Sequence, residues 1–214
     1  MIIHIWSDIV CPWCYVGKRR FERGLERFPH RERVEVVYRS FQLNPDAPAG
    51  ETSDRQEMLR RKYRLTEDQV DALDVRMVEA AKAEGLQYNL KGTRTGNTLD
   101  AHRLLHLALD EQKQNAALER LYRAYFTEQR SIFDRESLAA LGVEAGLNPV
   151  RTRETLESDR YAERVALDLA QARGIGIGGV PFFVIDGKYG VSGAQPPDVF
   201  ADALRRAWSD RTAN

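Results

Sequence analysis

Cys11 and Cys14 are the only cysteines among the 214 residues of the chain, and Pro12 and Trp13 separate them. Two thiols at this spacing can close a small disulfide ring, and the outward thiol can attack another disulfide as a thiolate. At a helix N-terminus that thiolate is favoured, because unpaired N–H groups and the macrodipole stabilise negative charge. The segment therefore predicts a redox dithiol in which Cys11 is the nucleophile. Cys14, one turn further in, is expected to attack the mixed disulfide and release the partner.

The elements that must position this dithiol can be read from the first forty residues. Alternation of isoleucines over Ile2–Trp6 indicates a strand that ends just before the cysteines. From Pro12 onward aromatic and leucine side chains recur at helical spacing, so the dithiol is expected in the first turn of a helix. The stretch Val34–Phe41 predicts a second strand, and the order strand, helix, strand indicates a parallel unit.

The middle of the chain has a different character. After a turn-rich linker over residues 44–50, charged segments rich in leucine and alanine are typical of helices, and no strand signal is present there. Capping, stopping and breaking residues predict the helix boundaries. They are Thr66 with Gln69 as a capping box, Gly85 as a stop, Asn97 or Thr98 and Asp134 as starts, and Asn148-Pro149 as a break.

The last forty residues predict a strand hairpin and a helix. Residues 181–185 form an apolar strand pattern, Asp186-Gly187 is a hairpin signal, and residues 189–192 return. Pro197 opens a terminal helix, and residues 210–214 are expected to fray. The glycine-rich run 174–179 precedes a strand instead of opening a helix, so we expect it to let the backbone approach the active site closely and not to cradle phosphate.

Charge and composition restrict the partners. Lys+Arg and Asp+Glu number 32 each, which gives a formal net charge of +0 and argues against nucleic acid or an acidic membrane as partner. The basic triplet Lys18-Arg19-Arg20 is expected to be a solvated helix face. The first residues lack signal-peptide features and no apolar span is long enough for a membrane helix, so we expect a cytoplasmic protein. In that compartment a CxxC pair is catalytic or metal-binding more often than structural.

The order of these elements, with Val180-Pro181 before the hairpin, resembles the thioredoxin fold of the DsbA family of disulfide oxidoreductases. The cytosolic FrnE-like branch of that family is the closer resemblance, and several segments carry it. They are Asp8 to Cys14, Phe41-Gln42-Leu43-Asn44-Pro45, Asn97-Thr98 with Ala101 to Leu104, Gly179 to Val184, and Ser192 to Gln195.

The resemblance implies an α/β protein with a thioredoxin fold. Its mixed four-stranded sheet would have the order 2-1-3-4, with the hairpin antiparallel to the parallel pair. Residues 1–48 and 173–214 would form the thioredoxin-like domain, and residues 49–172 an inserted all-helical domain. Some FrnE-like proteins carry a second cysteine pair that this chain lacks, so electrons cannot pass between two dithiols within one molecule.

The resemblance also implies an activity, thiol-disulfide exchange with protein or peptide substrates through Cys11 and Cys14. Glutathione or a thioredoxin-type protein would recycle the dithiol, and neither a cofactor nor a metal would be needed. Oxidase, reductase and isomerase share these residues, so the direction stays open. The periplasmic DsbA proteins have a histidine where this chain has Trp13, and an indole supplies no positive charge, so strong oxidant behaviour is not implied.

Further site residues follow from the same resemblance. Pro181 would face the dithiol through a cis peptide bond, which leaves the backbone of Val180 free to pair with an extended substrate. The active-site loop would comprise Pro12, Trp13 and Asp8, and the carboxylate of Asp8 is either a proton acceptor or a cap of the loop. The predicted substrate-binding residues are Val180, Pro181, Phe41, Leu43 and Asn97.

Three alternatives remain beside this interpretation. In the first, His102 and His106, four residues apart on one helix, would complete a zinc site with the two cysteines. Kappa-class glutathione transferases and 2-hydroxychromene-2-carboxylate isomerases are similar in architecture but use a serine where Cys11 stands. A redox-independent holdase would bind unfolded chains at a groove near Phe41, Leu43 and Phe182.

Overall fold

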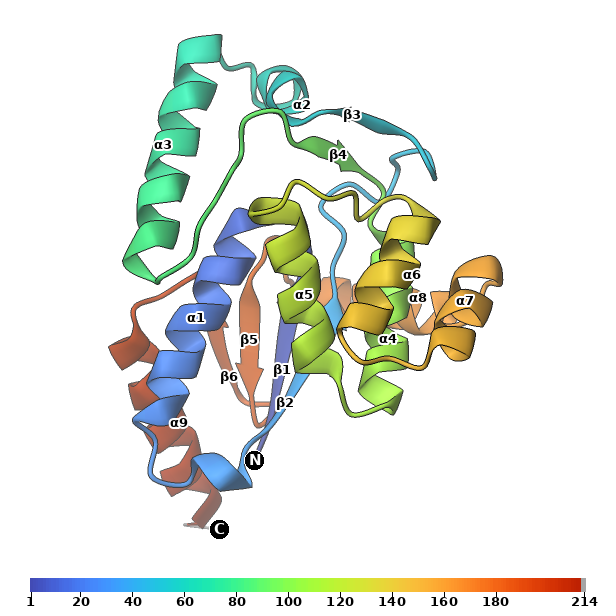
Figure 1. Ribbon diagram of the computed structural model, residues 1–214. Coiled ribbons are helices and arrows are strands. Elements are labelled where there is room, and N and C mark those ends of the chain that lie inside the picture. The colour runs from blue at the N-terminus through green and yellow to red at the C-terminus, as the bar shows by residue number, and fades with distance from the viewer. Residues whose placement is uncertain (213–214) are drawn as a thin grey trace.

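The computed structural model describes residues 1–212, and a four-stranded mixed sheet lies at its centre (Figure 1). The strands are β1 (Ile2–Ser7), β2 (Glu35–Ser40), β5 (Phe182–Ile185) and β6 (Tyr189–Ser192), in the order β2-β1-β5-β6. Strand β1 is parallel to β2 and antiparallel to β5, and β6 is antiparallel to β5. The predicted sheet order and the antiparallel hairpin are confirmed.

Two helices cover one face of the sheet, α1 (Pro12–Glu26) and α9 (Pro197–Thr212) (Figure 1). Because side chains alternate along a strand, Ile3 and Ile5 of β1 are buried on this face. The ring of Phe21 on α1 lies 5.4 Å from that of Phe183 on β5 and 5.6 Å from that of Phe200 on α9. The helix that begins with the dithiol is thereby fixed to the sheet by aromatic packing.

The opposite face of the sheet carries a smaller apolar cluster. Trp6 of β1 is buried there with Ala172 and Ile177, and its indole N–H donates to the backbone oxygen of Asp168 at 3.0 Å. Phe182 of β5 packs against the same cluster. Residues from the end of α8 (Ala162–Gly174) therefore cover the sheet face that α1 and α9 leave free.

The segment between β2 and α8 is largely helical. It contains α2 (Arg55–Tyr63), α3 (Glu67–Ala83), α4 (Leu99–Asp110), α5 (Gln114–Phe126), α6 (Arg135–Glu144) and α7 (Pro149–Glu157). Before this segment, a 3₁₀ turn at Arg31–Arg33 connects α1 to β2. The predicted capping box of Thr66 and Gln69 is present at α3, and Asp134 caps α6. Thr98 precedes α4, as expected.

The structure departs from the sequence predictions in this segment. Strands β3 (Thr52–Asp54) and β4 (Arg94–Gly96) form an antiparallel two-stranded sheet that was not predicted. Both strands are short and contain no large apolar residue, so they give no strand signal. Asn148-Pro149 separates α6 from α7, as predicted, but α7 itself was not predicted. The side chain of Asn148 caps α7 by accepting the N–H groups of Val150 and Arg151.

The chain end also differs from its prediction. Helix α9 continues through Thr212 and includes Asp210, where fraying was expected. The hydroxyl of Tyr189 on β6 donates to the Asp210 carboxylate, which ties this turn of the helix to the sheet. Residues 213 and 214 of the expected frayed end lie outside the described residues.

The helical segment covers the outer edge of β2, which is an edge strand of the sheet. The side chain of Gln114 on α5 accepts the N–H of Tyr38 and donates to its carbonyl, both at 2.9 Å, and Asp168 of α8 accepts the N–H of Ser40 at 2.8 Å. An uncovered edge strand presents unpaired backbone N–H and C=O groups to which a strand of another molecule can bind. Here the side chains of Gln114 and Asp168 bond those groups at Tyr38 and Ser40. The division into domains at residues 48/49 and 172/173 stays a prediction.

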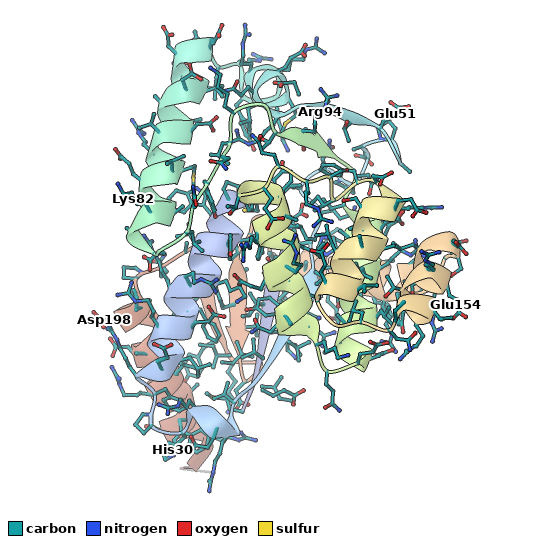
Figure 2. All side chains as sticks on the ribbon, in the orientation of Figure 1. His30, Glu51, Lys82, Arg94, Glu154 and Asp198 are labelled. Atoms are coloured by element: carbon teal, nitrogen blue, oxygen red, sulfur yellow. The ribbon has the colours of Figure 1, made fainter. Side chains whose placement is uncertain are left out.

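The molecular surface carries mixed charge, as the balanced composition requires. Lys82, Glu154 and Asp198 point outward from α3, α7 and α9 (Figure 2). Within residues 1–212, no helix combines the length and the apolar composition needed to cross a bilayer.

Candidate active site

The dithiol lies where β1 ends and α1 begins. Cys11 is the N-cap residue of α1 and Pro12 its first residue, as predicted. The N–H of Cys11 donates to the Asp8 carbonyl at 3.1 Å, and that of Cys14 donates to the Cys11 carbonyl at 3.0 Å. The hydroxyl of Tyr88 donates to the Pro12 carbonyl at 2.7 Å. These bonds fix the backbone of the turn and leave the Cys11 thiol at the positive end of the helix.

The loop before β5 closes over Cys11. The peptide bond between Val180 and Pro181 is cis, as the resemblance implied. The Cys11 thiol donates to the carbonyl oxygen of Val180 across 3.5 Å, and Pro181 is buried against α1. Cys11 and the loop predicted to bind substrate are therefore in direct contact, although 169 positions separate Cys11 from Val180 in the chain.

Cys14 is buried behind Cys11, with 2% of its surface exposed. Burial raises the pKa of the Cys14 thiol well above its ordinary value, and the hydrogen bond and charge of Cys11 raise it further. The backbone N–H of Asp8 and the hydroxyl of Ser7 act in the opposite direction and favour the thiolate. The net effect keeps Cys14 a neutral thiol at neutral pH.

Asp8 is buried under the active-site turn, with 1% of its surface exposed. Its carboxylate accepts the backbone N–H of Leu43 at 2.8 Å and lies 3.3 Å from Nε2 of His102. The same Nε2 lies 2.9 Å from the carbonyl oxygen of Phe41, so it faces two acceptors and carries a hydrogen. Asp8 thus joins the turn before the dithiol to the segment that follows β2, which matches the capping role.

Apolar side chains of the site differ in exposure. Trp13 between the cysteines is 42% exposed and Leu43 is 36% exposed, whereas Val180 is partly buried. Phe41 and Phe182 are also partly buried and pack with the Trp6 cluster on the sheet. Trp13 and Leu43 therefore offer the most open apolar surface among the predicted site residues.

Comparison with known proteins agrees with this geometry. Residues 2–205 match the model of the DSBA-like thioredoxin domain. The chain belongs to the DsbA-like thioredoxin family. The structure of a probable DsbA oxidoreductase from Streptomyces coelicolor is 46% identical, with a TM-score of 0.95 over 99% of this chain and 91% of that one. The uncharacterized protein YwbO of Bacillus subtilis is 29% identical over 95% of this chain and 96% of its own length.

A more distant relative in structure is the cytosolic disulfide reductase DsbM of Pseudomonas aeruginosa. It shares 17% identity and a TM-score of 0.69 over 98% of this chain and 99% of its own, and at that identity the likeness shows the fold alone. DsbM has also been solved with glutathione. The family membership makes this DsbA-like protein an oxidoreductase-type enzyme with its cysteines in CXXC spacing.

Asn97 of the DsbA-like protein uses its amide within the structure. Its oxygen accepts from the Gln42 side chain at 2.9 Å and from the N–H of Leu99 at 2.9 Å, while its nitrogen donates to the Ala47 carbonyl at 2.7 Å. Asn97 thus fixes the linker that follows Leu43. Its contact with substrate stays a prediction.

The two helix histidines are buried, and each faces its own carboxylate. His102 lies beside Asp8, whereas Nε2 of His106 lies 3.2 Å from Oδ2 of Asp168 and 3.2 Å from Oγ of Ser40. Over residues 1–212, no group of three or more His, Cys, Asp or Glu side chains is arranged to hold a metal ion.

The basic triplet on α1 was predicted wrongly as a solvated face. Lys18 has 2% of its side chain exposed, and its Nζ lies 2.5 Å from Glu22 and 3.0 Å from Glu119 of α5. Arg19 pairs with both of these glutamates, and Tyr15 donates to Glu119 at 2.6 Å. Because Glu119 belongs to another helix, no local pattern reveals this buried network, which joins the dithiol helix to α5.

The glycine-rich run does not have the predicted role either. A Cβ atom at Gly174, Gly178 or Gly179 would meet nothing within 4 Å, so close backbone approach does not account for these glycines. Gly176 has a φ of 76°, a left-handed conformation that favours glycine just after α8. Close approach beside the dithiol is instead found at Gly17 on α1, which lies against Pro181.

Several site residues were missed from the sequence. Tyr88 bonds the Pro12 carbonyl from a loop after α3, and Ser7 shares a hydrogen bond with Tyr122 of α5. None of these lies in a recognisable motif. Only the position of Ser7, directly before the conspicuous Asp8, carries a local signal.

Proposed function

We propose that this protein exchanges electrons between its dithiol and the disulfides or dithiols of protein or peptide substrates. The observation that carries the proposal is the contact of the Cys11 thiol with the Val180 carbonyl, while Cys14 lies buried behind Cys11. A substrate sulfur that reaches Cys11 must pass the Val180–Pro181 loop, whose backbone can pair with an extended segment. Cys11 is then the nucleophile and Cys14 the resolving thiol.

The proposed reaction has two balanced steps. The Cys11 thiolate attacks one sulfur of the substrate disulfide, which forms a mixed disulfide and releases the other substrate sulfur as a thiolate that takes up a proton. The Cys14 thiolate then attacks Sγ of Cys11, and the mixed disulfide breaks. The enzyme is left with a Cys11–Cys14 disulfide and the substrate has gained two electrons and two protons. The reverse sequence oxidises a substrate dithiol.

Substrate contacts and recycling belong to the same proposal. Trp13 and Leu43 offer exposed apolar surface to a substrate chain, and Phe41 and Asn97 are the further substrate-binding residues of the proposal. Glutathione is a candidate for recycling, and the structure of DsbM with glutathione supports it. A cytoplasmic location, where the glutathione pool keeps thiols reduced, fits this role.

Two measurements test the proposal. Reduction of insulin disulfides should be catalysed by the wild-type protein and lost in Cys11→Ser. Equilibration with glutathione buffers of graded composition should give one two-electron transition of the Cys11–Cys14 pair, and its midpoint assigns the direction in a given compartment. Undiminished insulin reduction by Cys11→Ser would contradict the proposal.

The same variants separate the alternatives. A glutathione-dependent transferase or isomerase activates the thiol of glutathione, so its activity would survive Cys11→Ser. A redox-independent holdase would suppress aggregation of an unfolded client equally well after loss of both cysteines. The proposed exchange requires Cys11 in every turnover.

A further inference from the structure

Arg20 on α1 joins two distant parts of the chain through different nitrogen atoms. Its Nη1 donates to the backbone carbonyl of Ala194 at 2.7 Å, and its Nε donates to the carboxylate of Glu84 at 2.7 Å. Glu84 is the C-cap residue of α3, whose end lies beside α1 (Figure 1), and Ala194 lies between β6 and α9. The side chain of Arg20 is 22% exposed, so its guanidinium is largely shielded from water.

The segment after β6 holds the loop that carries the cis-proline. The antiparallel ladder between β5 and β6 continues into this loop, because the N–H of Gly193 donates to the carbonyl of Pro181 at 2.8 Å. Gly193 directly precedes Ala194 in the chain. Val180 directly precedes Pro181, and its carbonyl accepts the Cys11 thiol. Two hydrogen bonds therefore lead from the guanidinium on α1 to the loop that contacts the nucleophile.

The face of α1 on both sides of Arg20 is in close contact with the same part of the chain. A Cβ atom on Gly17, one turn before Arg20, would stand 3.4 Å from Cβ of Ala194. A Cβ atom on Gly24, one turn after it, would stand 2.7 Å from the carbonyl oxygen of Pro197, the first residue of α9. Residues three and four apart lie on one face of a helix. Arg20 therefore donates to Ala194 from a face of α1 that packs tightly against this segment.

We propose that Arg20 is a positioning residue for polypeptide substrates. By holding the segment after β6, it keeps the Val180–Pro181 loop where the backbone of an extended substrate can pair with Val180 while its sulfur reaches Cys11. The inference rests on the proposed function and deepens it, because it assigns a preference for polypeptides over small disulfides to a named contact. A small disulfide that reaches Cys11 needs no backbone pairing, so its reaction is nearly independent of Arg20.

A guanidinium is suited to this role, and the chain offers a matched comparison. A hydrogen bond from a charged donor is roughly twice as strong as one between neutral groups, and the planar guanidinium can serve the carbonyl and the carboxylate at once. Arg23, one turn further along α1, also donates to Glu84, at 2.8 Å. The two arginines share Glu84 and differ at Ala194, whose carbonyl accepts from Arg20. Comparison of their variants therefore isolates the contact with Ala194.

Single-turnover reactions of the reduced protein with two disulfides that have the same leaving group test the proposal. One is dithiobis(nitrobenzoate), and the other is an unstructured peptide whose single cysteine is held as a mixed disulfide with nitrothiobenzoate. In each case the Cys11 thiolate attacks a sulfur, the S–S bond breaks, and nitrothiobenzoate leaves as a thiolate with the bonding electron pair. In the ratio of the two second-order rate constants, peptide over small disulfide, any general change in the reactivity of Cys11 cancels.

The expected result is selective for the peptide. Arg20→Ala should lower the ratio about tenfold, while the rate constant for dithiobis(nitrobenzoate) stays within about twofold of wild type. Arg20→Lys, which offers one nitrogen where the guanidinium uses two, should lower the ratio about threefold. The matched control is Arg23→Ala, which removes a partner of Glu84 and leaves Ala194 bonded, and its ratio should equal that of wild type.

A second peptide, N-methylated at the residues that flank its cysteine, tests whether Arg20 acts through backbone pairing. N-methylation removes the N–H groups that would donate to Val180, so wild type should react with this peptide about tenfold more slowly than with the parent peptide. Arg20→Ala should react with both peptides at nearly equal rates, because the pairing is already lost. Non-additivity of this kind identifies two changes that act on one contact.

The inference is overturned if Arg20→Ala leaves the ratio unchanged, or lowers it no more than Arg23→Ala does. It is equally overturned if Arg20→Ala slows the N-methylated peptide as much as the parent peptide. If Arg20→Ala does not fold, Arg20→Lys decides the question by the same readouts. Failure of the proposed function looks different: the wild-type protein would then reduce no insulin disulfides and would keep the parent peptide attached to Cys11, because Cys14 would not release it.

Discussion

Gly17 lies so close to Pro181 that a Cβ atom on Gly17 would stand 2.8 Å from Cγ of the proline. The same atom would lie 3.4 Å from Cβ of Ala194, which follows β6. The ring of Pro181 therefore packs directly on the backbone of α1, with no side chain of the helix between them. This contact determines how near the Val180 carbonyl comes to the Cys11 thiol.

Gly17→Ala is expected to separate these two parts of the site. The added methyl group must displace Pro181, and overpacking of this kind costs about 1–3 kcal/mol. Urea unfolding of the reduced protein should show a lower midpoint, and Cys11 should reduce insulin more slowly. Gly174→Ala is the control, because a Cβ there meets nothing within 4 Å and alanine is favoured in a helix by about 0.5–1 kcal/mol. Equal urea midpoints for Gly17→Ala and Gly174→Ala would contradict this expectation, because the loop with Pro181 would then move aside without a loss of stability.

Cys14→Ser should accumulate a mixed disulfide between Cys11 and substrate. Without the second thiol, nothing within the molecule can attack Cys11, and the intermediate persists until an external thiol releases it. Non-reducing electrophoresis and mass spectrometry of the variant incubated with an unfolded disulfide-containing protein would detect the adduct. Cys11→Ser under the same conditions should give none. Adducts through Cys14 in Cys11→Ser would reverse the assigned roles.

Asp8→Ala should destabilise the protein more than Asp8→Asn does. The alanine variant removes the carboxylate that accepts the N–H of Leu43 and lies beside Nε2 of His102. Each buried donor that is left without a partner lowers the free energy of unfolding by about 1–3 kcal/mol. The asparagine side chain can still accept from Leu43, so it should retain most of the stability. Chemical unfolding of the two variants measures the difference. If Asp8 were chiefly a proton acceptor, both variants would lose exchange rate equally and keep their stability.

Stability should fall in acid, in part through Asp168. Burial opposes ionisation of this carboxyl, but hydrogen bonds from His106 and from the Ser40 N–H, with the charge of Arg39, hold its pKa below the ordinary value. A carboxyl with a lowered pKa contributes stability above its unfolded pKa of about 3.9 and loses it as pH falls through the folded value. Asp168→Asn should therefore cost about 1–3 kcal/mol at neutral pH, and the difference from wild type should shrink below about pH 4. A difference that is constant from pH 7 to pH 3 would contradict this account.

The strands of the main sheet could be predicted from the sequence because each carries an apolar run and each turn its own residue types, whereas the order of the strands came from the resemblance to the DsbA family. The strand before the dithiol, the helix from Pro12 and the hairpin at Asp186-Gly187 are all local signals of this kind. Strands β3 and β4 have no such signal, since they are short and polar and their pairing depends on a distant partner. Helix α7 was missed because Asn148-Pro149 was interpreted only as a break, whereas the asparagine also caps the helix that follows.

The site was predictable where chemistry is carried by residue type and unpredictable where it depends on tertiary contacts. Two cysteines three positions apart, with a proline at the helix start, indicate the dithiol by themselves. Lys18 pairs with Glu119 and Ser7 bonds Tyr122, and both partners belong to α5. Nothing in the sequence near α1 specifies these partners.

The central position of β1 in the sheet has a consequence for synthesis of the chain. The Val180 carbonyl is made 169 positions after Cys11, and β5, which pairs with β1, follows it. Contacts between distant parts of a chain form late, after the intervening segments are available. Until residues 180–185 have been made, the nascent chain presents Cys11 without the loop that covers it, and the thiol lacks its specific surroundings.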